Sequence, residues 1–131
     1  MWLTSGISTS GGRVLLADDN DLLRELLGQI ISSCGFEVTE AEDGRHALDI
    51  FIGADKGFDL LITDLRMPRL SGGELIREIR RCKPDIPVIA ITGYIDPATL
   101  DEVKALDVRL FSKPVDIDEL RQYIHSLQLA A

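Results

Sequence analysis

Five polar side chains stand directly after, or at the end of, short apolar runs of the sequence, and together their types could do chemistry. Three are carboxylates, one is a hydroxyl and one is an amine: Asp18, Asp19, Asp64, Thr92 and Lys113. Carboxylates that meet in one crevice repel each other and raise each other's pKa values. A hard divalent cation relieves that repulsion, and Mg²⁺ suits a site that offers few carboxylates and keeps water ligands. The set therefore predicts a Mg²⁺ site with a hydroxyl and a positive charge beside it.

Such a set of side chains is suited to handling a phosphoryl group. The cation and Lys113 would neutralise phosphoryl oxygens, while an aspartate acts as the nucleophile. Each residue alone has a simpler explanation, because a lone aspartate often caps a helix or a turn. The threonine and the lysine alone would be an ordinary strand-end residue and an ordinary surface residue. What favours a site is that the surrounding elements are expected to bring all five to one edge of a sheet.

The elements that would position these residues alternate regularly along the chain. Apolar or alternating runs predict five strands, at residues 14–17, 36–39, 60–63, 88–92 and 108–112. Apolar residues at helical spacing fill the intervals, and the first helix carries Leu22, Leu23, Leu26, Leu27, Ile30 and Ile31 on its apolar side. The other helices are preceded by capping residues, namely Asp43, Ser71 with Glu74, Asp96 before Pro97, and Asp116 with Glu119.

Strands and helices in strict alternation predict an α/β fold with a parallel sheet and helices on both faces. The first, third and fourth strands are continuously apolar, as strands buried on both faces must be, whereas the second and fifth carry polar residues and are expected at the edges. With right-handed crossovers, this division predicts a flavodoxin-like, doubly wound (βα)5 sheet with strand order 2-1-3-4-5. A ligand is then expected at the carboxyl ends of strands one and three, where Asp18, Asp19 and Asp64 stand.

The composition narrows the class of protein. The chain has 131 residues, 22 acidic and 14 basic side chains, a formal net charge of −8 and a pI of about 4.6. This acidity argues against direct binding to nucleic acid or to an anionic membrane surface. No apolar run approaches the roughly 18 residues of a membrane helix, and the first residues do not resemble a signal peptide, so we expect a cytoplasmic protein. Cys34 and Cys82 lie among apolar neighbours, which predicts reduced, half-buried thiols.

Residues 13–128 are expected to form one domain. Residues 1–12 are rich in serine, threonine and glycine without periodicity, which predicts a flexible tail or linker, and residues 129–131 are expected to be a short C-terminal tail. The length fits one domain, because ordinary domains cluster near roughly 100–150 residues.

Four motifs give the chain a family resemblance. They are Val14-Leu15-Leu16-Ala17-Asp18-Asp19-Asn20, Asp64-Leu65-Arg66-Met67-Pro68 with Gly72, Ile91-Thr92-Gly93, and Ser112-Lys113-Pro114. In this order and spacing, they resemble the receiver domain of two-component response regulators, from about Arg13 to Leu127. The resemblance implies a domain that takes a phosphoryl group from the phosphohistidine of a histidine kinase or histidine phosphotransfer domain and then switches its interactions with partners.

The resemblance also implies a role for each acidic residue of the site. Asp64 would be the phosphoacceptor, attacking the phosphorus atom of the phosphohistidine. Asp19 and Asp64 would bind Mg²⁺ directly, with the backbone carbonyl of Arg66 as a third ligand. Asp18 would act on the metal largely through water.

Further roles follow from the same resemblance for the residues around the acids. Thr92 and Lys113 would contact the phosphoryl oxygens, with Thr92 swinging inward to do so. The Lys113–Pro114 peptide bond is expected to be cis. Gly72 is expected to let the loop after the phosphoacceptor turn tightly.

Two positions beside the site modulate phosphoryl lifetime in this family, and here they are Arg66 and Tyr94. Both are bulky, and neither could easily orient an attacking water, so we expect slow self-dephosphorylation, on the order of minutes or longer.

The family also carries an aromatic switch residue three positions before the lysine. This chain has Leu110 there and places its aromatic, Phe111, one residue later. On a strand, that shift turns the side chain to the opposite face. Phe111 either takes the switch role in a shortened strand or belongs to the core; we favour the core.

Three other functions are weighed against a phospho-receiver. An aspartyl-phosphate-forming hydrolase on a similar fold needs a further acid two residues after the nucleophile, where Arg66 stands. A flavodoxin-like FMN binder needs a phosphate loop rich in serine, threonine and glycine, whereas Asp18-Asp19-Asn20-Asp21 would repel a phosphate without metal. A degenerate receiver that binds partners without phosphate is disfavoured because the set of five site residues is complete.

The expected context is that of a signalling module. The chain would be a single-domain regulator or the receiver end of a hybrid histidine kinase, catalysing its own phosphorylation and dephosphorylation but turning over no external substrate. Members of this family often pair weakly through the surface of their fourth and fifth helices, so a weak homodimer is possible here, and the sequence leaves the oligomeric state open.

Overall fold

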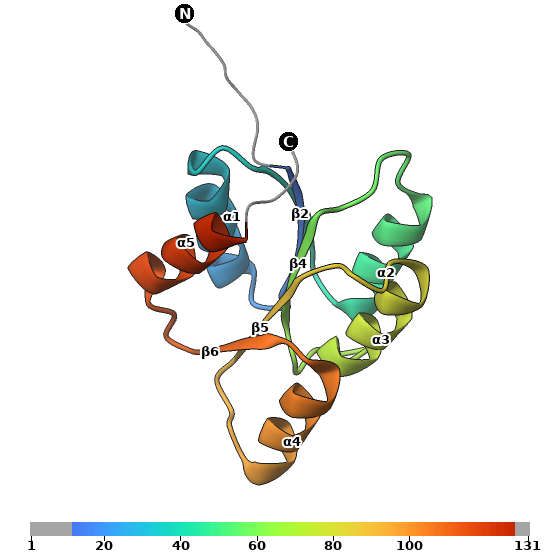
Figure 1. Ribbon diagram of the computed structural model, residues 1–131, viewed down its shortest axis with the longest axis vertical. Coiled ribbons are helices and arrows are strands. Elements are labelled where there is room, and N and C mark those ends of the chain that lie inside the picture. The colour runs from blue at the N-terminus through green and yellow to red at the C-terminus, as the bar shows by residue number, and fades with distance from the viewer. Residues whose placement is uncertain (1–11, 128–131) are drawn as a thin grey trace, which may run out of the picture.

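Figure 1 shows the computed structural model of the chain, which describes residues 12–127. Five strands alternate with five helices, in the order β2 (Arg13–Ala17), α1 (Asp21–Ser33), β3 (Glu37–Ala41), α2 (Gly44–Gly53), β4 (Leu60–Asp64), α3 (Gly72–Cys82), β5 (Val88–Thr92), α4 (Pro97–Leu106), β6 (Arg109–Ser112) and α5 (Ile117–Ser126). Apart from Gly12, the tails predicted at residues 1–12 and 129–131 lie outside the described residues.

The strands form one parallel sheet with the order β3-β2-β4-β5-β6, which confirms the predicted order 2-1-3-4-5. The central strands β2, β4 and β5 are almost wholly buried, and the edge strands β3 and β6 are partly exposed, as their polar residues predicted. Helices α1 and α5 cover one face of the sheet, and α2, α3 and α4 lie on the other (Figure 1).

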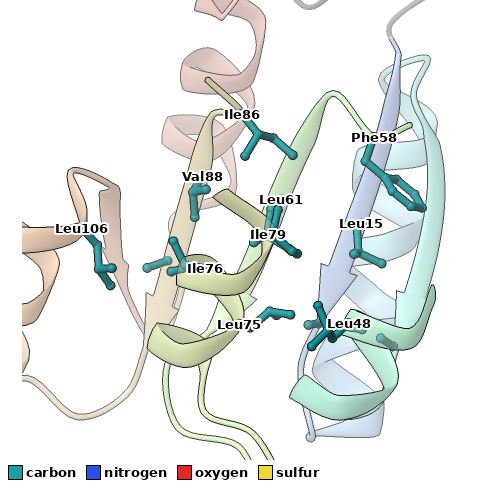
Figure 2. Packing of buried hydrophobic residues seen from close by; sticks show 14 of the residues in the cluster. Leu15, Leu48, Phe58, Leu61, Leu75, Ile76, Ile79, Ile86, Val88 and Leu106 are labelled. Atoms are coloured by element: carbon teal, nitrogen blue, oxygen red, sulfur yellow. The ribbon is translucent and has the colours of Figure 1, made fainter. Parts of the chain in front are cut away.

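Each face of the sheet has its own hydrophobic core, because side chains alternate between the faces along every strand. The core under α2 and α3 includes Leu15, Leu48, Phe58, Leu61, Leu75, Ile76, Ile79 and Ile86 (Figure 2). The core under α1 and α5 includes Val14, Leu16, Leu27, Ile31, Ile62, Ile91, Phe111, Leu120 and Ile124. Packed on both faces, β2 and β4 form a rigid base for the residues that follow them.

The four predicted helix caps are confirmed. Asp43, Ser71, Asp96 and Asp116 each accept a hydrogen bond from a backbone N–H of the helix that they begin. At α3 the capping box is complete, since the side chain of Glu74 also accepts from the backbone N–H of Ser71 at 3.2 Å. Pro97 opens α4, as expected of a proline at the first helical position.

Three local predictions are wrong. The second strand runs two residues further than expected, to Ala41, because its parallel pairing with β2 continues through Glu40 despite that polar side chain. Cys82 is exposed rather than half-buried, because it ends α3. Leu22 and Leu26 face solvent, at 79% and 50% exposure, because the leucines of α1 form a stripe wider than the face that the sheet covers. Among residues 12–127, no helix is long and apolar enough to span a bilayer.

Candidate functional site

The register of the sheet brings the predicted residues to one edge. Ala17 of β2 lies opposite Thr63 of β4, and Thr92 of β5 lies opposite Ser112 of β6, so the residues that follow these pairs meet at the carboxyl ends. Asp18, Asp64 and Thr92 are buried there, whereas Asp19 is exposed. This edge lies at the topological switch point, since β2 is flanked by β3 and β4.

The three carboxylates converge. One oxygen from each of Asp18, Asp19 and Asp64 lies within 4.8 Å of the other two. Hard oxygen ligands from few carboxylates, one of them open to water, are the donors that Mg²⁺ favours, so this cluster fits the ion. Burial, which disfavours the charged form, is the main reason that the pKa of Asp18 is raised above its ordinary value.

Lys113 supplies the positive charge of the site. Its Nζ donates to Oδ2 of Asp64 at 2.8 Å and lies 3.4 Å from Oδ2 of Asp18. Partial burial by itself lowers the pKa of Lys113, but the hydrogen bond and the charge of Asp64, with those of Asp18, outweigh it and raise that pKa overall. Lys113 therefore stays protonated throughout the neutral range. The peptide bond between Lys113 and Pro114 is cis, as expected.

Thr92 and Arg66 are not aimed at the acids in this conformation. The hydroxyl of Thr92 bonds within its own loop, donating to the carbonyl of Tyr94 at 3.3 Å and accepting from the N–H of Tyr94 at 3.2 Å. The backbone N–H of Arg66 donates to Oδ1 of Asp64 at 3.1 Å. The guanidinium of Arg66 instead stacks on the Tyr94 ring, 4.3 Å from its centre, and pairs with Asp96 at 3.4 Å. The side chains of Arg66 and Tyr94, the two positions expected to modulate phosphoryl lifetime, thus contact each other beside the site.

Gly72 lies where the loop between β4 and α3 turns back onto the sheet, and its N–H donates to the carbonyl of Leu65 at 3.0 Å. The residue of this loop with a positive φ is Arg69, at 71°, and the N–H of Leu70 closes the turn onto the carbonyl of Pro68 at 2.8 Å. Gly72 is needed for space, since a Cβ there would overlap the carbonyl oxygen of Asp64 and lie 2.7 Å from Cα of Leu65. The start of α3 therefore rests directly on the backbone of the candidate phosphoacceptor.

Leu110 and Phe111 point to opposite faces of the sheet, as the shift of one residue requires. Leu110 is half-buried against the core under α2 and α3. Phe111 is buried in the core under α1 and α5, where its ring meets Tyr123 edge-on at 6.1 Å. The burial of Phe111 agrees with the preferred interpretation, in which this aromatic belongs to the core.

Sequence reasoning missed three residues that shape the site. Asn20, rather than either aspartate, caps α1, and its N–H donates to Oδ1 of Asp18 at 2.8 Å. Arg69 pairs with Asp43, the cap of α2, at 3.2 Å, which holds the β4–α3 loop against α2. Arg24 donates to the carbonyl of Asp18 at 2.7 Å. The only sequence signal for Arg24 was its position on the first turn of the helix after the acids.

A cleft of about 660 Å³ lies beside the carboxylate cluster. Asp19 and Arg66 border it on one side, and Thr99 and Glu102 of α4 on the other. The exposed carboxylate of Asp19 therefore faces a space that an incoming group could enter.

A family model for the response regulator receiver domain matches residues 14–125. The chain belongs to the response regulator receiver family. The receiver is 32% identical over 120 residues to the response regulator receiver protein CpdR of Brucella abortus (strain 2308), covering 91% of this chain and 98% of CpdR. It is 37% identical over 125 residues to the regulatory protein AtoC of Escherichia coli (strain K12), covering 92% of this chain.

Solved structures agree with this assignment. The receiver superimposes on a response regulator receiver protein from Pseudomonas putida with a TM-score of 0.81 and 32% identity, covering 90% of this chain and 98% of that one. The match spans only 26% of AtoC and 31% of a cyclic di-GMP phosphodiesterase from Thermotoga maritima, so receivers of this kind also occur within longer proteins.

Proposed function

We propose that this receiver accepts a phosphoryl group on Asp64 from a phosphohistidine, with Mg²⁺ held by the neighbouring acids. The observation that carries the proposal is the arrangement around Asp64: one carboxylate oxygen accepts from Lys113 at 2.8 Å, and two further carboxylates lie within 4.8 Å. Asp19 and Asp64 would hold the metal with the carbonyl of Arg66, and Asp18 would act through water. When bound, Mg²⁺ supplies positive charge that offsets the carboxylates and the phosphoryl oxygens.

The transfer follows from the residues of the chain. A carboxylate oxygen of Asp64 forms a bond to phosphorus, while the bond between phosphorus and the imidazole nitrogen of the donor breaks. The imidazole leaves with the electron pair of that bond and takes up a proton. Lys113 offsets the charge of the phosphoryl oxygens. Thr92 gives up its two hydrogen bonds to Tyr94 and donates to a phosphoryl oxygen, a charge-assisted bond that is stronger than those it replaces.

One experiment tests this proposal. The receiver is incubated with a small phosphodonor and Mg²⁺, and its intact mass is measured. We expect a single phosphoryl adduct in the wild type and none in Asp64→Asn. The control variant Asp85→Asn removes an exposed acid that precedes β5, at the amino ends of the strands, and should form the adduct as the wild type does. An adduct that persists in Asp64→Asn, or its absence from the wild type under donor excess, would contradict the proposal.

Metal binding is expected to stabilise the fold. At a Mg²⁺ concentration about tenfold above its dissociation constant, binding to the folded state alone adds about 1.4 kcal/mol to the free energy of unfolding. For a domain of this size, the Tm should rise by about 4 °C. Thermal unfolding with Mg²⁺ and with a chelator measures the difference, which Asp19→Asn should largely abolish and Asp85→Asn should leave unchanged. An equal rise in Asp19→Asn would show that the ion binds elsewhere.

The phosphoryl group on Asp64 is expected to persist for minutes or longer. Arg66 and Tyr94 contact each other beside the site, and neither offers a carboxylate or amide that orients a water for attack. Shortening both to alanine should speed the loss of the adduct about tenfold, which corresponds to about 1.4 kcal/mol of barrier. Intact mass followed over time after removal of the donor measures the rate. Rapid loss from the wild type, unchanged in the double variant, would refute the expectation.

We further propose that the partner, a histidine kinase or histidine phosphotransfer domain, docks on the start of α1. Leu22 and Leu26 are exposed there, and the helix begins directly after the acids. Changing both leucines to serine should slow transfer from a phosphorylated partner about tenfold, because the lost apolar burial weakens the complex by about 1–2 kcal/mol. Transfer from a small phosphodonor should not change. Ile52→Ser on α2, also an exposed apolar residue, is the matched control, and an equal loss in that variant would exclude α1 as the docking surface.

The context of the receiver belongs to this proposal as well. The domain would promote its own phosphorylation and dephosphorylation and turn over no external substrate, whether it acts alone or as the receiver end of a hybrid histidine kinase. We also propose that it acts in the cytoplasm, without direct contact with nucleic acid or membrane. Weak pairing would use the surface of α4 and α5.

A further inference from the structure

Arg24 joins α1 to the turn that carries the acidic pair. Its side chain is only 15% exposed, and its guanidinium contacts three oxygens from different segments. Nη1 donates to the backbone carbonyl of Asp18 at 2.7 Å, Nη2 pairs with the carboxylate of Asp21 at 2.8 Å, and Nε donates to the carboxylate of Glu40 on β3 at 3.2 Å. The planar fork of arginine suits such multiple contacts, whereas a lysine ammonium does not reproduce them.

The hydrogen bond from Arg24 gives the backbone carbonyl of Asp18 its partner. Asp18 is buried, and its pairing with β4 has ended at Ala17, so its carbonyl oxygen needs a donor from outside the sheet. The backbone N–H of Asp18 donates to Ala41, and its two carboxylate oxygens are held by Asn20 and Lys113. With Arg24, each polar atom of Asp18 has a partner.

Glu40 and Gly28 support this arrangement from the other side of Arg24. A Cβ at Gly28, one turn further along α1, would lie 2.9 Å from Oε2 of Glu40. The glycine thus leaves the space in which the Glu40 carboxylate lies against α1 and holds the guanidinium. The contacts run from the edge strand β3 through Arg24 to the turn at Asp18 and Asp19.

We propose that Arg24 is a positioning residue of the Mg²⁺ site, which holds the turn at Asp18 and Asp19 in the conformation that faces their carboxylates toward Asp64 before the metal binds. This inference rests on the proposed function, because it concerns the same metal. Residues that orient metal ligands without touching the metal typically change affinity by about 10–100-fold when they are lost. Arg24 touches no reacting atom, so its effect is exerted through the turn.

Arg13 provides a matched control for Arg24. It lies at the end of β2 opposite to the acids and pairs with Glu37 of β3 at 3.3 Å. Its guanidinium also donates to the carbonyls of Lys56 and Gly57. Like Arg24, Arg13 therefore links a glutamate of β3 to the backbone of another segment, but it does so far from the acids. Calorimetric titration with Mg²⁺ alone, at a temperature where both variants are folded, is expected to show about tenfold weaker binding or more in Arg24→Met. Arg13→Met should stay within about twofold of the wild type. Equal affinities in the two variants would overturn the proposal.

A metal-free measurement separates positioning from charge. In a chelator, amide hydrogen exchange should be faster in Arg24→Met than in the wild type or Arg13→Met at Asp18 and Asn20, because the turn has lost its anchor. The N–H groups of these two residues bond to the carbonyl of Ala41 and to Oδ1 of Asp18. Arg24→Lys, which keeps the charge but not the fork, should remain at least about threefold weaker for Mg²⁺ than the wild type. Unchanged exchange in Arg24→Met, or full recovery of affinity in Arg24→Lys, would overturn the proposal.

A second variant serves if Arg24→Met does not fold. Gly28→Ala displaces the flexible end of Glu40 while favouring the helix, since alanine suits a helix interior better than glycine. We expect about threefold weaker Mg²⁺ binding without loss of helix stability, and in that case unchanged affinity would overturn the proposal. Failure of this inference is distinct from failure of the proposed function, because the latter shows in the adduct assay on the wild type and Asp64→Asn, where Arg24 is intact.

Discussion

Lys113→Met is expected to slow phosphorylation by a small phosphodonor about hundredfold, because removing one preorganised donor of charge-stabilising hydrogen bonds typically costs about 10²–10³ in rate. The Nζ of Lys113 contacts the carboxylates of both Asp64 and Asp18, so the variant also leaves two buried carboxylates without their counter-charge. The adduct formed over time, followed by intact mass at saturating Mg²⁺, measures the rate.

The matched control is Lys83→Met. Lys83 is also a partly buried lysine, but its Nζ donates to the carbonyl of Phe58, at the opposite edge of the sheet. A general loss of stability would slow both variants alike, whereas a role at the site slows only Lys113→Met. A rate in Lys113→Met within about threefold of that in Lys83→Met would therefore argue against charge stabilisation by Lys113. The pKa of Lys113 is raised above its ordinary value, so its amine stays protonated from about pH 7 to about pH 9. The difference in phosphorylation rate between Lys113→Met and Lys83→Met should therefore be the same at both pH values.

Gly72→Ala is expected to destabilise the fold by about 3 kcal/mol, at the upper end of what overpacking of a close contact costs. The new methyl group would overlap the carbonyl of Asp64 and press on Cα of Leu65, and these are backbone atoms that cannot rotate away. The start of α3 must shift, and with it the backbone of the phosphoacceptor. Urea denaturation measures the stability, and the adduct assay on the folded variant measures the site, where slower phosphorylation is expected as well.

Gly53→Ala is the matched control for this substitution. Gly53 ends α2, and a Cβ there would meet no atom within 4 Å, so the variant should change stability by less than about 0.5 kcal/mol. Equal stability of Gly72→Ala and Gly53→Ala would show that α3 can move away from β4 at little cost.

Much of the fold could be predicted from the sequence because local and long-range signals agree. Short continuous apolar runs between helical segments are typical of strands buried on both faces, and these three strands form the centre of the sheet. Short polar side chains before each helix identify its start. The convergence of Asp18, Asp64 and Lys113 followed from topology alone, since the carboxyl ends of parallel strands share one edge.

The remaining features depend on contacts between distant segments, which no local pattern reports. The leucine stripe of α1 was wider than the buried face, so Leu22 and Leu26 could be placed outside only once the sheet was known. The need for Gly72 arises from the backbone of Asp64, which packs against it across the loop, and not from a positive φ. The three contacts of Arg24 likewise join the turn after β2, α1 and β3. Close approaches of this kind become visible only when the chain is folded.

Borohydride reduction of the phosphorylated receiver tests most directly the claim that Asp64 carries the phosphoryl group. An aspartyl phosphate is reduced at its acyl carbon to homoserine, whereas a free carboxylate is not, so peptide mass mapping after reduction identifies the residue. After treatment with a phosphodonor and Mg²⁺, we predict homoserine at position 64 alone, and none in a sample kept without donor. Homoserine at position 18 or 19, or a phosphoryl adduct that leaves no reduced aspartate, would contradict the assignment of Asp64.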